Sequence, residues 1–172
     1  MTISSNNFST DKNSIGKVCY NWWTRLIDKN SGYMRADHAQ LRRADSTSTA
    51  LVVETVHILH KDLCQVGCDL RNKPDLLALI ALSLAQVPES GPETVAKMMG
   101  GNPPSISGIR FNTIIRTTDP ADLTPLIRRA LRAIGSSVNV NQLSTDLIWW
   151  NEATRARWCF DYYGASSAIP KH

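Results

Sequence analysis

Arginines gather in three short stretches of this 172-residue sequence, and the planar guanidinium of arginine suits contact with phosphate or carboxylate. The stretch LTPLIRRALRAIG, residues 123–135, reads as one helix that carries Arg128, Arg129 and Arg132. Arg128 and Arg132 stand one turn apart, where like charges cost about 0.2–0.5 kcal/mol, and no acidic residue lies three or four positions from either. The pattern therefore indicates a helix whose charge is compensated by an anion from outside it.

The other two stretches carry the same chemistry. LRRA contains Arg42 and Arg43, and RFNTIIR contains Arg110 and Arg116. If the three stretches converge in space, they form a basic track for a nucleic-acid backbone. The alternative is that each arginine pair only solvates its own helix face.

The charge distribution agrees with a polyanionic partner. The formal net charge is +4, and residues 101–172 carry 8 Lys and Arg against 5 Asp and Glu, whereas residues 1–100 carry 11 against 10. The apolar fraction of 42% and the charged fraction of 20% are ordinary for a globular protein and exclude disordered and fibrous classes. Composition alone names no function.

A second candidate group lies in HILHKDLCQVGC, where His57, His60, Cys64 and Cys68 recur at three- and four-residue spacing. These are zinc-ligating residue types. However, the four would spread over about 16 Å of a helix, so one ion could take only two adjacent members, and Gly67 weakens the last turn. We therefore expect an ordinary buried or half-buried helix face and no metal, with the cysteines as reduced thiols.

Two tryptophan pairs, Trp22–Trp23 and Trp149–Trp150, raise a related question. Neighbours on a helix point about 100° apart, so we expect one member of each pair to face away from the core. An exposed tryptophan can stack on bases or anchor a protein contact, and residue statistics favour the core or a subunit contact.

No catalytic motif is present. The sequence contains no P-loop, G-x-G-x-x-G, G-x-S-x-G or H-E-x-x-H, and its carboxylates are scattered. We expect a binding protein, not an enzyme, that uses no cofactor.

Helical periodicity dominates the elements that must position these residues, and no convincing strand appears. The expected class is all-α, a bundle of about seven to nine helices in two packed subdomains. Helices are expected from Ser14 to about residue 28, around HAQLRRA, from Ser48 or Thr49 to Leu63, from Pro74 to about Val87, around ETVAKMM, around IRFNTIIRT, from Pro120 to Ile134, and as one or two further helices ending near Gly164.

The breaker GGNPPSISG separates the two expected subdomains. The expected divisions are a polar tail at 1–13, an N-terminal helical subdomain at 14–99, a linker at 100–108, a C-terminal helical subdomain at 109–164, and a tail at 165–172. The longest apolar run, LLALIALSLAQV, is too short to cross a bilayer, and the first residues lack the apolar core of a signal peptide. We therefore expect a cytoplasmic protein that does not insert into membranes.

Three longer stretches resemble a known family, CasB, the small subunit of the type I-E CRISPR Cascade surveillance complex. They are WWTRLIDKNSGYMRADHAQLRRADS, ISGIRFNTIIRTTDPADLTPLIRRALRAIG and DLIWWNEATRARWCFDYYG. The resemblance implies an all-helical, non-enzymatic subunit, present in more than one copy, between the large subunit and the backbone subunits that hold the guide RNA. It also implies that basic residues stabilise the opened target DNA, chiefly the displaced strand of the R-loop, for a separate nuclease-helicase.

Matched by position, the family's basic residues fall on Arg42 and Arg43, Arg110 and Arg116, and Arg128 and Arg129, with Arg35 and Arg132 as weaker matches. The family often continues its Arg-Phe motif with further arginines, whereas Asn112 and Thr113 follow Phe111 here.

Two other functions remain open at this stage. One is a helical structural adaptor that binds acidic protein partners without touching nucleic acid. The other is a helix-turn-helix regulator, which is disfavoured because no compact three-helix unit with a polar recognition helix stands out.

Overall fold

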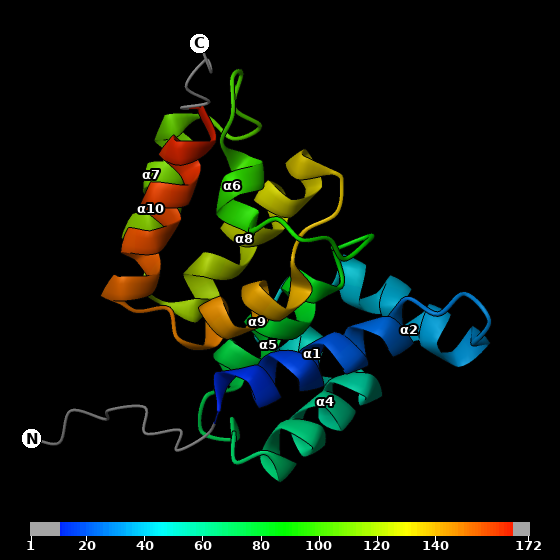
Figure 1. Cartoon of the computed structure of the whole chain (residues 1–172). Coiled ribbons are helices and arrows are strands. Elements are labelled where there is room, and N and C mark those ends of the chain that lie inside the picture. Colours follow the sequence, from blue (N-terminus) through cyan, green and yellow to red (C-terminus); the bar gives the residue numbers. More distant parts are fainter. Residues whose placement is uncertain (1–10, 167–172) are drawn as a thin grey trace, which may run out of the picture.

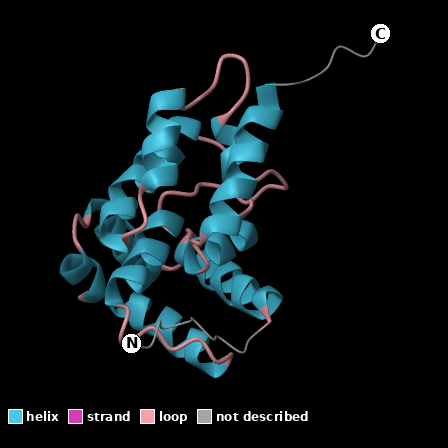
Figure 2. Cartoon of the chain, turned by 90° about the vertical axis from the view of Figure 1, so that its left-hand side faces the viewer, coloured by secondary structure: helices cyan, strands magenta, loops and turns pink. Residues whose placement is uncertain are grey.

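A computed structural model describes residues 11–166 of the chain as ten α-helices, with isolated β-bridges but no β-strand in that range. The all-α prediction is confirmed, and Figures 1 and 2 show helices joined by loops throughout. The one helix expected from residue 48 to Leu63 is divided into α3 and α4, which accounts for a count above the expected seven to nine. The helices are α1 (Lys12–Leu26), α2 (Gly32–Arg43), α3 (Thr47–Leu51), α4 (Glu54–Gln65), α5 (Pro74–Leu84), α6 (Val95–Met99), α7 (Gly108–Arg116), α8 (Pro120–Ile134), α9 (Val140–Ile148) and α10 (Glu152–Ser166).

Helix α8, which carries three of the arginines, begins and ends where its local sequence predicts. The side chain of Asp119 accepts hydrogen bonds from the backbone N–H groups of Ala121 and Asp122, and Pro120 occupies the first turn, where its missing N–H costs nothing. Gly135 ends the helix with a φ of +64°, a left-handed conformation that glycine adopts without strain.

The single helix expected from residue 48 to Leu63 is wrong, because the chain bends between α3 and α4. Ser46 and Thr49 form a reciprocal capping box that starts α3, and the helix ends after only five residues. The bend leaves Val52 72% exposed and turns Val53 into the core instead. The expected helix rests on an apolar stripe at helical spacing, Val52, Val56, Leu59 and Leu63, and the last three members of this stripe are buried on α4.

The core is centred on α5, whose residues from Leu76 to Leu84 are all buried. Helices α3, α4, α8 and α9 pack around it, α1 lies against α9 and α4, and α6 lies against α10 (Figure 1). Helices on both sides of the expected linker at 100–108 contribute to one hydrophobic cluster. The two expected subdomains therefore share a core, and the division between them remains a prediction.

The expectation that one tryptophan of each pair faces away from the core is wrong for the first pair. Trp22 is 0% and Trp23 3% exposed, and their indole N–H groups donate to the carbonyl oxygens of Thr55 (2.9 Å) and Val87 (3.0 Å). Both can be buried because α1 is covered on more than one side, by α9 and by α4. Trp149 and Trp150 are both half-buried.

Among residues 11–166, none of the helices is long and apolar enough to span a membrane.

Candidate nucleic-acid interface

Arg128 lies on the side of α8 that faces the end of α2, and it is only 8% exposed. Its guanidinium donates to the carbonyl oxygens of Ala44 (2.5 Å), Arg42 (2.9 Å) and Leu41 (3.4 Å). These carbonyls belong to the C-terminal end of α2, which carries the negative end of the helix dipole. Arg128 therefore holds α8 against α2.

The compensation that the sequence attributes to an outside anion is, for Arg128, supplied within the chain. Burial lowers the pKa of Arg128, and the positive charge of Arg132 lowers it further. The carbonyl oxygens of α2 accept hydrogen bonds from both terminal nitrogens of the guanidinium. The prediction that Arg128 touches nucleic acid is untested. Both terminal nitrogens of its guanidinium donate within the fold, whereas its buried Nε has no hydrogen-bond partner among the described residues.

The end of α2 places two further predicted arginines on the surface. Arg42 and Arg43 occupy the last turn of the helix and are exposed. Arg42 and Arg35 both line a cavity of about 330 Å³ that also includes Gln86. Arg132 of α8 reaches the same region, because its Nε donates to Oε1 of Gln86 at 3.1 Å.

On its other side, α8 forms a groove with α7. Arg110 of α7 and Arg129 of α8 are both exposed and line a cavity of about 370 Å³ whose remaining walls are largely apolar. Arg116, the last residue of α7, is exposed as well but does not line this groove. Helix α8 thus connects an arginine cluster at α2 with another at α7.

None of the five ion pairs found among residues 11–166 uses these arginines. Other arginines do have acidic partners: Arg25 pairs with Asp62 at 2.8 Å, and Arg155 with Glu152 at 3.0 Å. The exposed members of the predicted set therefore form no ion pair with carboxylates of residues 11–166, although Asp28 lines the same cavity as Arg35 and Arg42. A polyanion is the partner that such a surface favours.

Sequence reasoning missed four further polar residues that line the α2 cavity, namely Asp28, Lys29, His38 and Gln86. Lys29 lies in the turn between α1 and α2, where its backbone carbonyl accepts a hydrogen bond from Arg35. Helical periodicity gives no signal for a turn residue. A lysine six positions before Arg35 was the only sequence cue.

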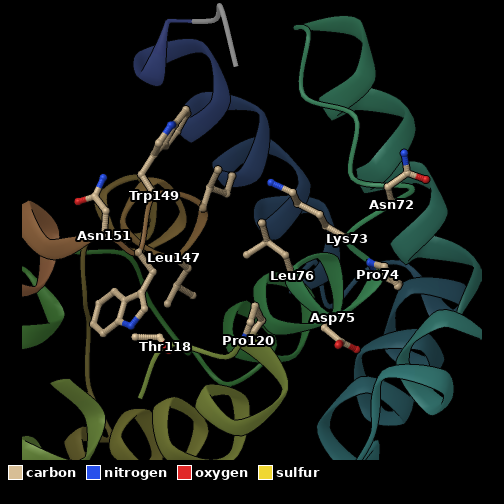
Figure 3. A pocket seen from close by; sticks show the side chains of 12 residues that line it. Asn72, Lys73, Pro74, Asp75, Leu76, Thr118, Pro120, Leu147, Trp149 and Asn151 are labelled. Atoms are coloured by element: carbon tan, nitrogen blue, oxygen red, sulfur yellow. The ribbon is translucent and has the colours of Figure 1, made fainter. Parts of the chain in front are cut away.

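A larger cavity, about 580 Å³, lies where the N-terminal ends of α5 and α8 meet the C-terminal end of α9. Trp149 and Asn151 lie on one side of this α5–α9 cavity and Asn72 and Lys73 on the other (Figure 3). The ammonium nitrogen of Lys12 lies 5.3 Å from the centre of the Trp149 ring, within cation–π range. None of the predicted arginines lines this cavity.

The fold and the arginine surface define an all-α protein with an exposed set of arginines suited to a polyanion. The chain belongs to the family of CRISPR-associated protein Cse2, whose family model matches residues 37–163. No curated protein matches the sequence.

Solved structures share the fold. The crystal structure of CasB from Thermus thermophilus is 18% identical and superposes with a TM-score of 0.67, covering 87% of this chain and 97% of that one. A second crystal structure from the same species, of a CRISPR-associated protein of the Cse2 family, is 19% identical, with a TM-score of 0.67 over 87% of this chain and 97% of that chain. A chain in the crystal structure of E. coli Cascade bound to a PAM-containing dsDNA target is 13% identical, with a TM-score of 0.64 over 86% of this chain and 95% of that one.

Proposed function

We propose that this chain is the non-catalytic small subunit of a type I-E CRISPR Cascade effector complex. In this role it contacts target DNA through exposed arginines and stabilises the R-loop, chiefly its displaced strand. Membership of the Cse2 family and the likeness to a chain of DNA-bound E. coli Cascade support the assignment to a complex. The proposed DNA contact rests on one observation: the exposed arginines form no ion pair with carboxylates among residues 11–166.

The physical demand of this function is modest and fits such a surface. R-loop formation exchanges one duplex for another of similar stability, so contacts with the nucleic-acid backbone can tip the balance without reading sequence. Arginines that face solvent can make these contacts. The proposed set is Arg35, Arg42, Arg43, Arg110, Arg116, Arg129 and Arg132, whereas Arg128 contributes by fixing α8 against α2.

The partners in this proposal are the large subunit, the backbone subunits with their guide RNA, the target DNA and further copies of this chain. The first experiment is therefore a pull-down of the tagged chain from its native host, with sequencing of bound RNA and mass spectrometry of bound proteins. We expect repeat-derived guide RNA and the other effector subunits. If neither the guide RNA nor the other subunits are recovered, the assignment is wrong.

The second experiment tests the DNA contact in the assembled complex. We expect the Arg110→Ala/Arg129→Ala double variant to assemble normally but to protect the displaced strand less. Its binding should also depend less steeply on salt, because two phosphate contacts are lost. Arg25→Ala is the matched control, since Arg25 is also exposed but pairs with Asp62. If the double variant keeps the salt dependence of the wild type, these two arginines do not contact DNA.

A structural adaptor is a second candidate, favoured by exposed apolar side chains on neighbouring helices. Ile109 on α7 is 84% exposed, and Phe160 and Tyr163 on α10 are 80% and 61% exposed. Such side chains are typical anchors of protein contacts. If the adaptor function is the main one, Phe160→Ser will prevent assembly while the arginine variants leave DNA binding unchanged. Trp23 cannot serve in this test, because it is buried and its substitution would disturb the core.

A further inference from the structure

The end of α4 and the turn that follows it bring three metal-ligating side chains together. Nε2 of His60 lies 3.4 Å from Sγ of Cys64 and 3.1 Å from Oδ1 of Asp69. Within residues 11–166, this is the one group of three or more such residues whose ligand atoms all lie within 4.8 Å of one another.

Local geometry explains why these three residues meet. His60 and Cys64 are four positions apart on α4 and therefore share one face. Gly67, with a φ of +83°, then turns the chain back so that Asp69 returns to His60. The same turn directs Cys68 into the core, where it is 0% exposed.

The composition of this group differs from the one that the sequence suggested. Cys68 is buried, and Nε2 of His57 lies 2.6 Å from the carbonyl oxygen of Leu51, on the side of α3. Neither residue belongs to the group. Asp69 supplies the third ligand atom instead, from beyond the end of the helix. The objection that a straight helix separates the ligands too widely therefore applies to His57 and Cys68 but not to Asp69.

The separations suit a tetrahedral zinc ion. Zn–N and Zn–O bonds of about 2.0–2.1 Å and a Zn–S bond of about 2.3 Å place ligand atoms roughly 3.3–3.6 Å apart. The two separations from Nε2 of His60, 3.1 and 3.4 Å, lie close to this range. Sγ of Cys64 and the carboxylate oxygen of Asp69 lie within 4.8 Å of each other, so adjustment of these two exposed side chains completes the site. Imidazole, thiolate and carboxylate together are also a ligand set typical of Zn²⁺ and not of Mg²⁺ or Ca²⁺.

We propose that His60, Cys64 and Asp69 bind one Zn²⁺ ion, with water at the fourth position. Cys64 and Asp69 are exposed, so the ion can enter from solvent and keep an aqua ligand. On binding, the thiol of Cys64 releases its proton to solvent and the sulfur donates an electron pair to zinc; no oxidation occurs. Without zinc, Nε2 of His60 accepts a hydrogen bond from the backbone N–H of Leu70 at 3.1 Å. Zinc replaces this N–H as the partner of Nε2.

The ion would join α4 to the segment that leads into α5. Asp69 also accepts a hydrogen bond from the backbone N–H of Arg71 at 2.9 Å, so its carboxylate is already fixed by the chain on that side. Residues 72–76 of the same segment line the α5–α9 cavity. Zinc bound here would therefore stiffen one wall of that cavity and raise the melting temperature of the chain.

The test is titration of the purified full-length chain with Zn²⁺ by calorimetry, and with Co²⁺ as a spectroscopic substitute. We expect one ion per chain and a thiolate-to-cobalt charge-transfer band. Cys64→Ser removes the band. Asp69→Asn keeps a side-chain oxygen that accepts from the backbone N–H of Arg71. Loss of an outer-shell partner weakens metal binding by roughly 10- to 100-fold, and we expect Asp69→Asn to weaken zinc binding by more than this.

His57→Gln and Cys159→Ser are the matched controls, since each removes a ligand type that lies outside the group. Both should bind Zn²⁺ as tightly as the wild type. Circular dichroism of each variant checks that the helices are retained. Absence of the charge-transfer band in the wild type, or equal zinc affinity in the wild type, Cys64→Ser and Asp69→Asn, would overturn the proposal and leave a hydrogen-bonded cluster at the helix end.

Discussion

The two sides of α8 use the same residue type in opposite ways. Toward α2, Arg128 is 8% exposed and donates to the carbonyl oxygens of Ala44 and Arg42. Toward α7, Arg129 is exposed and lines an open groove together with Arg110. Adjacent positions on a helix point about 100° apart, and here that rotation separates an arginine of the fold from an arginine of the surface.

The difference lies in what each side of α8 meets. The α2 side offers carbonyl oxygens at the end of a helix, and these groups need donors when they are buried. A guanidinium satisfies several of them at once, because it has five N–H donors in one plane. On the α7 side, the residues that line the groove with Arg129 carry apolar or basic side chains and no acceptor side chain, so the positive charge of Arg129 remains available to an outside anion. An arginine-rich motif can therefore place one guanidinium inside the fold and the next on the surface.

The largest effect is expected at the buried side. Arg128→Ala should lower the free energy of unfolding by about 2–4 kcal/mol, because it removes charge-assisted hydrogen bonds and leaves buried carbonyls of α2 without donors. Urea denaturation of the purified chain, followed by circular dichroism, measures this change.

Arg129→Ala is the matched control for that measurement. Arg129 is exposed, so its substitution should change the free energy of unfolding by no more than about 0.5 kcal/mol. Equal losses in the two variants would mean that the contrast between the two sides of α8 does not exist in solution.

Features that depend on nearby residues could be predicted from the sequence. The cap at Asp119, the stop at Gly135 and the apolar stripe between them fixed the bounds of α8, because helix capping and periodicity act over a few residues. The same local signals placed Pro74 at the start of α5. The all-α class follows from the sum of these signals.

Features that depend on distant partners could not be predicted. Arg128 is buried because residues 84 positions away supply carbonyls to it, and Trp23 is buried because Val87 accepts from its indole. Asp69 reaches His60 only because Gly67 reverses the chain. In each case the decisive group lies on another element or beyond a turn, where helical periodicity carries no information.

A second prediction concerns DNA binding by the exposed side in the assembled complex. Arg129→Ala should weaken binding by about 1–2 kcal/mol, a roughly 5- to 30-fold loss, and by similar amounts for unrelated target sequences. The slope of log affinity against log salt should fall by about 0.9, as expected for one lost phosphate contact. Electrophoretic mobility shift at several salt concentrations measures both quantities. A loss confined to one target sequence would point to base contacts and would contradict a backbone contact.

An effect on stability as small as that of Arg129→Ala is expected at Arg132, although this side chain makes a hydrogen bond within the fold. Its Nε donates to Gln86, a bond worth about 0.5–1.5 kcal/mol, but its charge repels that of Arg128 one turn away, and its exposure weakens both terms. These contributions oppose each other, so Arg132→Ala should change the free energy of unfolding by less than about 0.5 kcal/mol. Urea denaturation of Arg132→Ala and Arg128→Ala under the same conditions compares their free energies of unfolding directly. If Arg132→Ala lowers the free energy of unfolding as much as Arg128→Ala does, Arg132 is part of the contact between α8 and α2. Of the three arginines on α8, only Arg129 would then be available to DNA.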